Sequence, residues 1–437
     1  MHAHAHPHTV LDLAARVGAL LLGSAAAASE VTTTMRDIAR TAGLPEVTAD
    51  VTYSEIVLAD RSPGAAPTTR IENIRGRSFN YGRYIDVTRL VDRFVEGDLD
   101  VDQALDEVTQ IERGAGRYPW WLTRLAAGVA GASAALIFGG AWLVMAFAFA
   151  ANMVVDWAFA RLGPRGWPVF FLQLLTGAIA VAAAAAAPTV DPGVDSSLVV
   201  VSVIILMLAG QTSTGAVLDA VMGWNLTAVG RIFEAVMNTV GLVVGIKAGM
   251  LIAGRLGVDL NITADVAPEP LPLVVLLGAA ALIAIGFGAF AQMSPRVVLA
   301  ASALTTLGYL AFNAGLDADL GPLWASAAAA LLVGALAAVP ARWLKAPSAV
   351  FAGIAIIPML PGVLLYRGLL LTPDDFSGGV ALLVQALSTA VLLASCVALG
   401  EYLMSVTWRR LHRFESRFVP VFVNPFTRRP KAGRPER

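Results

Sequence analysis

The apolar positions change their pattern sharply near residue 121. From Leu122 to Met404 they form continuous blocks, and a helix of about 20 apolar residues can cross the roughly 30 Å hydrocarbon core of a bilayer. Short polar or Gly/Pro breaks separate the blocks. The pattern predicts an α-helical polytopic membrane protein with ten transmembrane helices: 122–139, 141–160, 168–187, 197–217, 228–253, 271–291, 297–315, 322–341, 348–368 and 379–404. Only Gly139-Gly140 divides the first two, so one long kinked helix is an alternative.

Residues 10–121 have the mixed pattern of a small α+β domain. Alternation with a period of two predicts strands, and apolar positions three and four residues apart predict helices. On these grounds we expect helices at 33–42, 85–96 and 101–113, and strands at 47–53, 55–60 and 70–75. Trp120 and Trp121 follow, where the aromatic belt of a membrane interface belongs.

The segment Val10–Ser29 is apolar enough to resemble a signal peptide. Asp12 and Arg16 interrupt it and no Lys or Arg precedes it, so an amphipathic helix is the preferred interpretation. Its apolar face would contain Val10, Leu13, Val17, Leu20 and Leu21. Residues 1–9 are predicted to be a disordered His-rich tail, and a metal ion bound by alternate histidines is the alternative: His2, His4, His6 and His8.

Composition narrows the class of protein. Of 437 residues, 57% are hydrophobic and 14% charged, against about 25% charged in soluble domains. This excludes an ordinary soluble enzyme, and the long continuous runs argue against a β-barrel. The 31 Lys and Arg are balanced by 32 Asp and Glu, so no basic excess is present to bind nucleic acid. We find no catalytic, nucleotide or metal-binding motif, and predict neither enzyme activity nor a cofactor.

Basic residues in the loops predict the orientation, because Lys and Arg concentrate in cytoplasmic loops. With residues 10–121 in the cytoplasm, the outer loops contain only Arg255 and Arg367. The tail 406–437 is also basic and would lie inside. Both termini are therefore expected in the cytoplasm. The residues assigned to the inner side are Arg161, Arg165, Arg231, Arg296, Arg342 and Lys345.

The ten spans divide into two sets of five, residues 122–254 and 271–405. Both fourth spans contain an interruption and both fifth spans are long, so Glu234 can be laid over Gln385 and Gly249 over Gly400. An odd number of spans in each half makes the second half enter the membrane from the opposite side. The prediction is an inverted repeat, the arrangement common in secondary transporters.

The two interruptions are the candidate substrate site. A broken helix leaves backbone groups unpaired, which hydrocarbon does not tolerate, so such breaks lie inside protein or beside water. Simple helix kinks and packing are the alternative. The residues singled out at the breaks and as hydrogen-bonding neighbours are Gln211, Thr212, Ser213, Asn238, Pro358, Pro361, Gly362, Tyr366, Gln385 and Ser388.

Charged residues inside apolar spans usually pair or face a cavity. Glu234 is the strongest candidate for a proton-coupling carboxylate, although Arg231 one turn earlier could simply neutralise it. Asp156, Asp219 and Glu401 lie near span ends, so an interfacial position explains them equally well. The residues predicted for proton coupling are Glu234, Asp219, Asp156 and Arg231.

Several segments resemble the threonine/serine exporter family of bacterial inner membranes. They are TTRIENIRGRSFNYGRYIDVTRLVDRFVEGDLDVDQALDEVTQI, the following Trp pair, the span 4–5 segment, and IIPMLPGVLLYRGLL, and the resemblance extends over about residues 10–405. The family has Pro-Gly at the fourth-span break, where Ala209-Gly210-Gln211 stands here. Positions matching its pattern are Asp219, Gly230, Arg231, Glu234, Pro358, Pro361 and Gly362.

The resemblance implies proton-driven export of threonine and serine, a cytoplasmic N-terminal domain and two five-span halves. The partners expected are a small amino acid, protons and the lipid bilayer, and homo-oligomers are compatible with the sequence. Two alternatives remain at this stage. One is a carrier or channel for another small solute, and the other is a membrane-tethered enzyme or signalling protein acting through residues 30–121.

Overall fold

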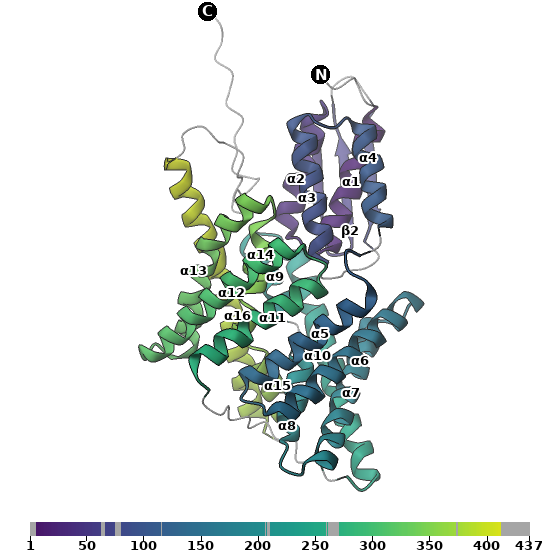
Figure 1. The fold of residues 1–437 in the computed structure, drawn as a ribbon. Coiled ribbons are helices and arrows are strands. Elements are labelled where there is room, and N and C mark those ends of the chain that lie inside the picture. Colours follow the sequence, from purple (N-terminus) through teal and green to yellow (C-terminus); the bar gives the residue numbers. More distant parts are fainter. Residues whose placement is uncertain are drawn as a thin grey trace, which may run out of the picture.

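The computed structural model describes residues 6–62, 66–74, 80–114, 116–205, 207, 210–258, 260, 271–372 and 375–411. Helices dominate, and a small unit containing three strands lies at one end of a long helical bundle (Figure 1). Most of the predicted His-rich tail, the loop 261–270 and residues 412–437 of the basic tail lie outside the described residues.

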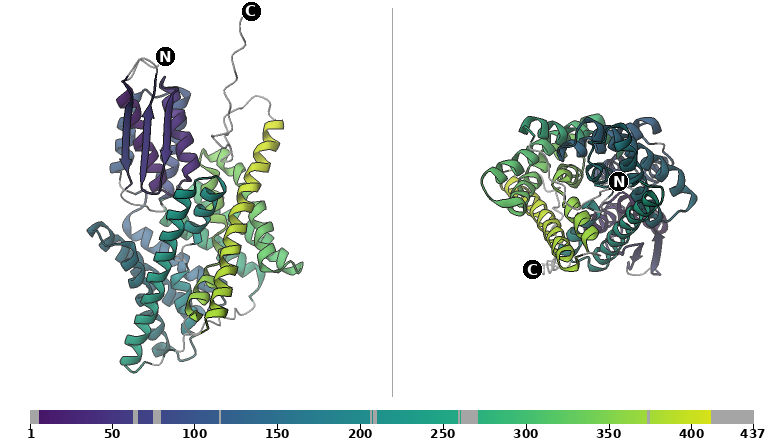
Figure 2. Two further views of the ribbon diagram at one scale, coloured as in Figure 1. Left: turned by 180° about the vertical axis from the view of Figure 1, so that it is seen from behind. Right: turned by 90° about the horizontal axis from the view of Figure 1, so that it is seen from below.

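The N-terminal unit, residues 7–113, contains the predicted strands and helices. The strands form an antiparallel sheet in the order β1-β2-β3, with Val51 opposite Ile56 and Ile56 opposite Glu72. Figure 2 shows the sheet on the outer side of the unit, with the helices behind it. The elements are α1 (Pro7–Gly23), α2 (Ala28–Thr41), β1 (Val47–Val51), β2 (Glu55–Asp60), β3 (Thr68–Asn73), α3 (Tyr81–Glu96) and α4 (Val101–Arg113).

Helix α1 is the buried centre of this unit. It begins at Pro7, so the predicted tail boundary at residue 9 is wrong. The expected apolar face is only part of what is buried, because Leu11, Ala14, Ala15 and Leu22 on other sides of the helix have no exposed surface. It contacts α2, α3 and α4 as well as β2 and β3. The predicted helix is confirmed, its buried surface is wider than the predicted apolar face, and α1 supplies the core on which the sheet packs.

Eight long helices among the described residues are apolar enough to cross a membrane: α5 (Trp120–Ile137), α6 (Trp142–Leu162), α7 (Val169–Val190), α10 (Asn225–Arg255), α11 (Leu273–Phe290), α12 (Pro295–Asp317), α13 (Gly321–Leu344) and α16 (Phe376–Leu411). A bent pair of helices between α13 and α16 makes up to nine. α5 and α6 are separate helices with Gly139 at φ 75° between them, so the single kinked helix is wrong. The span predicted at 197–217 is divided between α8 (Ser196–Ile204) and α9 (Gly210–Val221).

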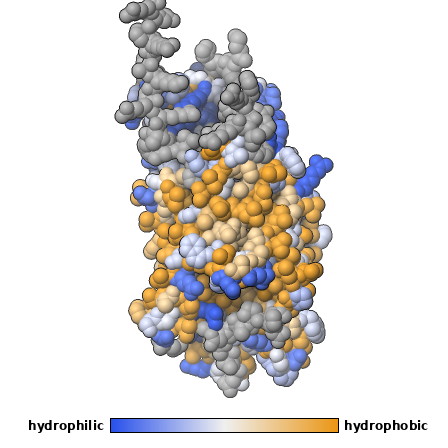
Figure 3. Space-filling view, turned by 90° about the vertical axis from the view of Figure 1, so that its left-hand side faces the viewer, coloured by the Kyte–Doolittle hydropathy of each residue, from blue (hydrophilic) through white to orange (hydrophobic). Residues whose placement is uncertain are grey.

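The outer surface of the bundle has the character of a lipid-facing surface. Figure 3 shows a broad apolar surface across the helices on the side in view, with polar residues gathered mainly above it and in its lower part. Exposed tryptophans mark both edges of the apolar surface. Trp120, Trp157 and Trp343 lie toward the N-terminal unit, and Trp142 and Trp324 lie at the opposite ends of their helices. Amphipathic indole rings favour the membrane–water interface, so these positions agree with a helical bundle in a bilayer.

Two helix crossings depend on glycine. A Cβ atom on Gly177 of α7 would meet the Leu242 carbonyl of α10, and one on Gly245 would meet the Leu174 carbonyl. In the second half, Gly334 of α13 and Gly400 of α16 approach each other's helices in the same way. In lipid, helices associate through close packing rather than hydrophobic burial, and small residues permit it.

We expect Gly245→Ala to destabilise the protein by about 1–3 kcal/mol, because the added methyl group overlaps a backbone carbonyl that cannot move alone. Gly278→Ala on α11 is the matched control, since a Cβ there meets nothing within 4 Å. Thermal unfolding of the detergent-purified proteins measures both. Equal unfolding temperatures for the two variants would contradict the crossing geometry.

Candidate functional site

The span predicted at 348–368 is discontinuous. α14 (Ser348–Ala355) ends before a short 3₁₀ turn (Ile357–Met359), and α15 (Gly362–Leu371) then begins with its axis bent by 43°. Pro358 lies in the turn and Pro361 is the residue before α15. Each proline lacks a backbone N–H and cannot continue an α-helical hydrogen-bond ladder. The chain is therefore forced open here, in the middle of an apolar segment.

The corresponding segment of the first half is also divided. α8 ends at Ile204 and α9 begins at Gly210, so two half-helices take the place of one continuous span. Gln211, Thr212 and Ser213 lie in the first turn of α9. Their side chains lie outside what the structure describes, and their predicted contacts with substrate stay predictions.

Two buried amides line the first break. Asn152 of α6 donates to the Ala148 carbonyl at 2.9 Å and to the Ser202 carbonyl of α8 at 3.5 Å. Gln173 of α7 donates to the Met207 carbonyl between the half-helices at 3.4 Å. Asn152 Oδ1 and Gln173 Oε1 are buried and have no hydrogen-bond partner among the described residues. The side-chain N–H groups thus pair with backbone carbonyls at the break, and the two side-chain oxygens remain available as acceptors.

Gln173 was missed in the sequence analysis. The available signal was a single amide inside the otherwise apolar segment 168–187. A polar side chain in the hydrocarbon region needs a hydrogen-bond partner, and for Gln173 that partner is the Met207 carbonyl, outside its own helix.

Tyr366 connects the second break to the first half. It lies one turn into α15, is 1% exposed, and packs in the same core as Val199 and Val200 of α8. Its hydroxyl is buried and without a hydrogen-bond partner in the described part of the chain. Asn152, Gln173 and Tyr366 thus each keep unused hydrogen-bonding capacity, the two amides at the first break and the tyrosine on the half-helix that packs against α8.

Asp219 and Arg231 form a buried ion pair of 3.1 Å at the turn between α9 and α10, with the Asp219 side chain fully buried. Asp219 also accepts the Ala28 N–H at 2.9 Å, and Arg231 donates to the Ala26 carbonyl at 2.7 Å. Ala28 is the first residue of α2, where the helix dipole favours a negative charge. Both side chains thus anchor the N-terminal unit to the C-terminal end of α9 and the beginning of α10, a role that the sequence analysis did not foresee.

The other predicted residues are dispersed. Asp156 lies 3.7 Å from Arg124, which packs over the Trp120 ring at the first membrane entry, so Asp156 belongs to the interface. Glu234 and Asn238 are partly buried on α10. Gln385 and Ser388 are exposed on α16 beside Val384 and Leu387, so the structure does not bring them together with the buried Tyr366.

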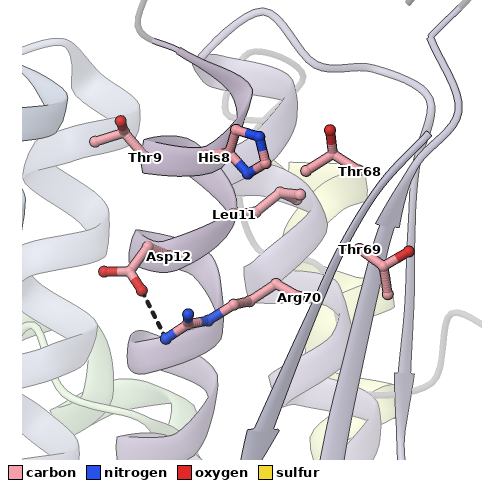
Figure 4. Close-up of a pocket in the computed structure, with 7 residues that line it drawn as sticks. All are labelled: His8, Thr9, Leu11, Asp12, Thr68, Thr69 and Arg70. Carbon is pink, nitrogen blue, oxygen red and sulfur yellow. Dashed lines mark ion pairs between the residues drawn. The ribbon is translucent and has the colours of Figure 1, made fainter. Parts of the chain in front are cut away.

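A separate pocket of about 420 Å³ lies at the outer tip of the N-terminal unit (Figure 4). His8 and Asp12 of α1 line it together with Thr68, Thr69 and Arg70 of β3. Asp12 and Arg70 face each other at 2.8 Å and neutralise its charge. All its lining residues come from α1 and the start of β3, so it is not part of the site formed by the broken helices.

We expect Asp219→Ala to lower stability by about 3–5 kcal/mol, because it leaves the Arg231 guanidinium buried without its carboxylate. Adding Arg231→Ala should recover part of that loss. Glu107→Ala, which removes the exposed Arg93–Glu107 pair of 2.7 Å, is the control and should cost at most about 1 kcal/mol. Thermal unfolding of these three variants and of Arg231→Ala alone forms the test, and additive losses at Asp219 and Arg231 would refute the pairing.

Comparison with known proteins covers almost the whole chain. A family model for threonine/serine exporters (ThrE) matches residues 12–253, and a second (ThrE_2) matches residues 277–406. A "probable threonine/serine exporter" of Mycobacterium tuberculosis is 33% identical over 92% of this chain and 77% of its own. The "threonine/serine exporter" of Corynebacterium glutamicum is 28% identical over 98% of this chain and 87% of its own. No solved structure matches. This multi-pass membrane protein belongs to the threonine/serine exporter family.

Proposed function

We propose that this protein exports threonine and serine across the bacterial inner membrane as a proton-coupled secondary transporter. Membership of the exporter family supports the substrate. The observation that carries the transport site is the pair of discontinuous helices, α8–α9 and α14–α15, with buried polar atoms left unpaired beside them. Discontinuous helices near the membrane centre are the usual substrate sites of secondary transporters.

The two halves are proposed to be inverted repeats. Support comes from matching contacts: α5 packs on α6, α7 on α10 and α9 on α10, as α11 packs on α12, α13 on α16 and α15 on α16. The glycine contacts favour a register in which Gly245, rather than Gly249, corresponds to Gly400. The fifth helices then align one turn away from the register expected from sequence, so Glu234 corresponds to Thr389 and not to Gln385.

A threonine or serine zwitterion fits the groups at the breaks. Asn152 Oδ1 and Gln173 Oε1 are acceptors suited to an ammonium group, and the Tyr366 hydroxyl can hydrogen-bond the substrate's carboxylate or hydroxyl. The N-terminal ends of α9 and α15 favour negative charge, which adds a second attraction for the carboxylate. Gln211, Thr212 and Ser213 on the first turn of α9, with Pro358, Pro361 and Gly362 at the second break, complete the proposed site.

Glu234 is proposed to bind and release the coupling proton, with both termini in the cytoplasm. The Arg231–Asp219 pair supports this role, because Arg231 already has Asp219 as a carboxylate partner and Glu234 is not required to neutralise it. Asp219, Arg231 and Asp156 are engaged in ion pairs near the membrane edge and are not proposed as carriers of the proton.

We expect Tyr366→Phe to raise the KM for threonine roughly threefold to tenfold, since one hydrogen bond contributes about 0.5–1.5 kcal/mol. Tyr402→Phe on the exposed surface of α16 is the control and should leave the KM unchanged. Saturable counterflow of labelled threonine in proteoliposomes measures both and distinguishes a carrier from a channel. An unchanged KM in Tyr366→Phe would remove this hydroxyl from the substrate site.

We expect Glu234→Gln to abolish threonine uptake driven by a pH gradient while preserving threonine–threonine exchange, because exchange requires no net proton transfer. Lys247→Gln, an exposed residue on the same helix, should retain both activities. If pH-driven transport survives in Glu234→Gln, the proton is carried elsewhere.

A further inference from the structure

Two carboxylates from distant parts of the chain meet where the N-terminal unit contacts the bundle. Glu30 of α2 accepts a hydrogen bond from the Tyr84 hydroxyl of α3. Glu401, near the end of α16, is hydrogen-bonded to Ser348, the first residue of α14, and lies close enough to Glu30 and Tyr84 to interact electrostatically. We call these four residues, Glu30, Tyr84, Ser348 and Glu401, the carboxylate seam.

The seam is partly shielded from water, with Tyr84 buried and the other three residues half-buried, and it contains few hydrogen-bond donors. Glu401 Oε1 is buried and has no hydrogen-bond partner among the residues described. Tyr84 from α3 and Glu401 from α16 face Glu30, Tyr81 lies beside Tyr84, and Ser348 from α14 faces Glu401. Tyr84 and Ser348 can each donate one hydrogen, so two carboxylates with four oxygens remain under-satisfied. A proton on one carboxyl group supplies a donor and removes one of two like charges.

We propose that Glu30 and Glu401 form a proton-binding site that controls how tightly the N-terminal unit docks on α14 and α16. The docked unit contacts α14, the half-helix that ends at the candidate substrate site. Export should therefore respond to pH on the side of the membrane where the N-terminal unit lies, and this part of the proposal rests on the proposed transport function.

The route from the seam to the site is short. Ser348 begins α14, the half-helix that ends at the second break. Tyr81 of α3 packs against Gly353 of the same half-helix, where a Cβ atom would lie 3.2 Å from the tyrosine oxygen. Movement of α3 away from the seam therefore removes the Tyr81 support of α14. The opposite half-helix, α9, is connected to the N-terminal unit through Asp219, which accepts the Ala28 N–H.

The direction of the pH effect follows from Glu30, which lies outside the membrane-spanning segments. Burial raises the pKa of its carboxyl group from 4.5 to about 7, although the Tyr84 hydrogen bond opposes the shift. Undocking exposes Glu30 and returns its pKa to the ordinary value. Docking is therefore strongest below pH 4.5, weakens as the pH rises to about 7, and changes no further above that pH through this group.

The test measures docking directly, by amide hydrogen exchange in α2, α3 and α14 of the full-length protein in nanodiscs between pH 5 and 8. After correction for intrinsic exchange, protection in the unmodified protein should fall about tenfold or more from pH 5 to 7. Glu30→Gln should keep high protection at all pH values, since the amide cannot ionise. Tyr84→Phe should move the transition to higher pH, because the hydrogen bond that lowers the Glu30 pKa is lost.

Glu46→Gln, exposed in the same unit, is the matched control and should retain the unmodified profile. A pH transition in Glu30→Gln equal to that of the unmodified protein would overturn the proposal, as would a downward shift in Tyr84→Phe. Threonine counterflow at fixed gradient and varied pH forms the second measurement, in which Glu401→Gln should flatten the dependence. Absence of threonine transport in the unmodified protein would refute the proposed function while leaving the exchange result on docking intact.

Discussion

The hydrocarbon interior offers no hydrogen-bond partner to an exposed backbone, and this constraint organises the whole bundle. Two helices are broken within apolar segments, so their free carbonyl and amide groups must be enclosed by other parts of the chain. At the first break, Asn152 and Gln173 reach carbonyls of α8 and of the segment after it. At the second, α15 packs through Tyr366 and Leu370 onto the first-half core. The carbonyls of the first break are thus paired by side chains of its own half, and the helix that follows the second break packs onto the first half.

The N-terminal unit is an integral part of this arrangement. One continuous hydrophobic core runs from α1 and the sheet through α3 into α11, α12, α13 and α14. Polar contacts fix the same surfaces, as Tyr118 donates to the Met293 carbonyl at 2.8 Å and Arg89 to the Leu344 carbonyl at 2.8 Å. A unit so attached cannot move without affecting the ends of the membrane helices, which argues against a freely tethered enzyme.

Much of the fold was predictable because it depends on local periodicity. The three strands, the helices of the N-terminal unit and eight long apolar helices each have a repeating pattern within a short window, and Pro358 and Pro361 mark the second break directly. The contacts that could not be predicted join residues far apart in the sequence. The Asp219 contact with Ala28 links positions 191 residues apart, and nothing in either neighbourhood indicates the other. The proposed fifth-helix register, one turn from that expected from sequence, depends on which glycine meets a carbonyl, and such contacts exist only in three dimensions.

The N-terminal unit is held at two places, the Asp219–Arg231 pair and the carboxylate seam, and the two contacts differ in strength. This difference determines which contact can separate more easily. The Asp219–Arg231 pair is buried and hydrogen-bonded to the backbone of residues 26 and 28, so removing one partner leaves the other buried without its counter-charge. The seam between Glu30 and Glu401 joins two groups of the same charge and is attractive only when a proton is present. An alternating-access movement must change how α9 and α14 sit relative to each other, and one rigid unit contacts both. If the protein transports as we propose, we expect this movement to open the seam and leave the ion pair closed, with α14 rather than α9 rearranging.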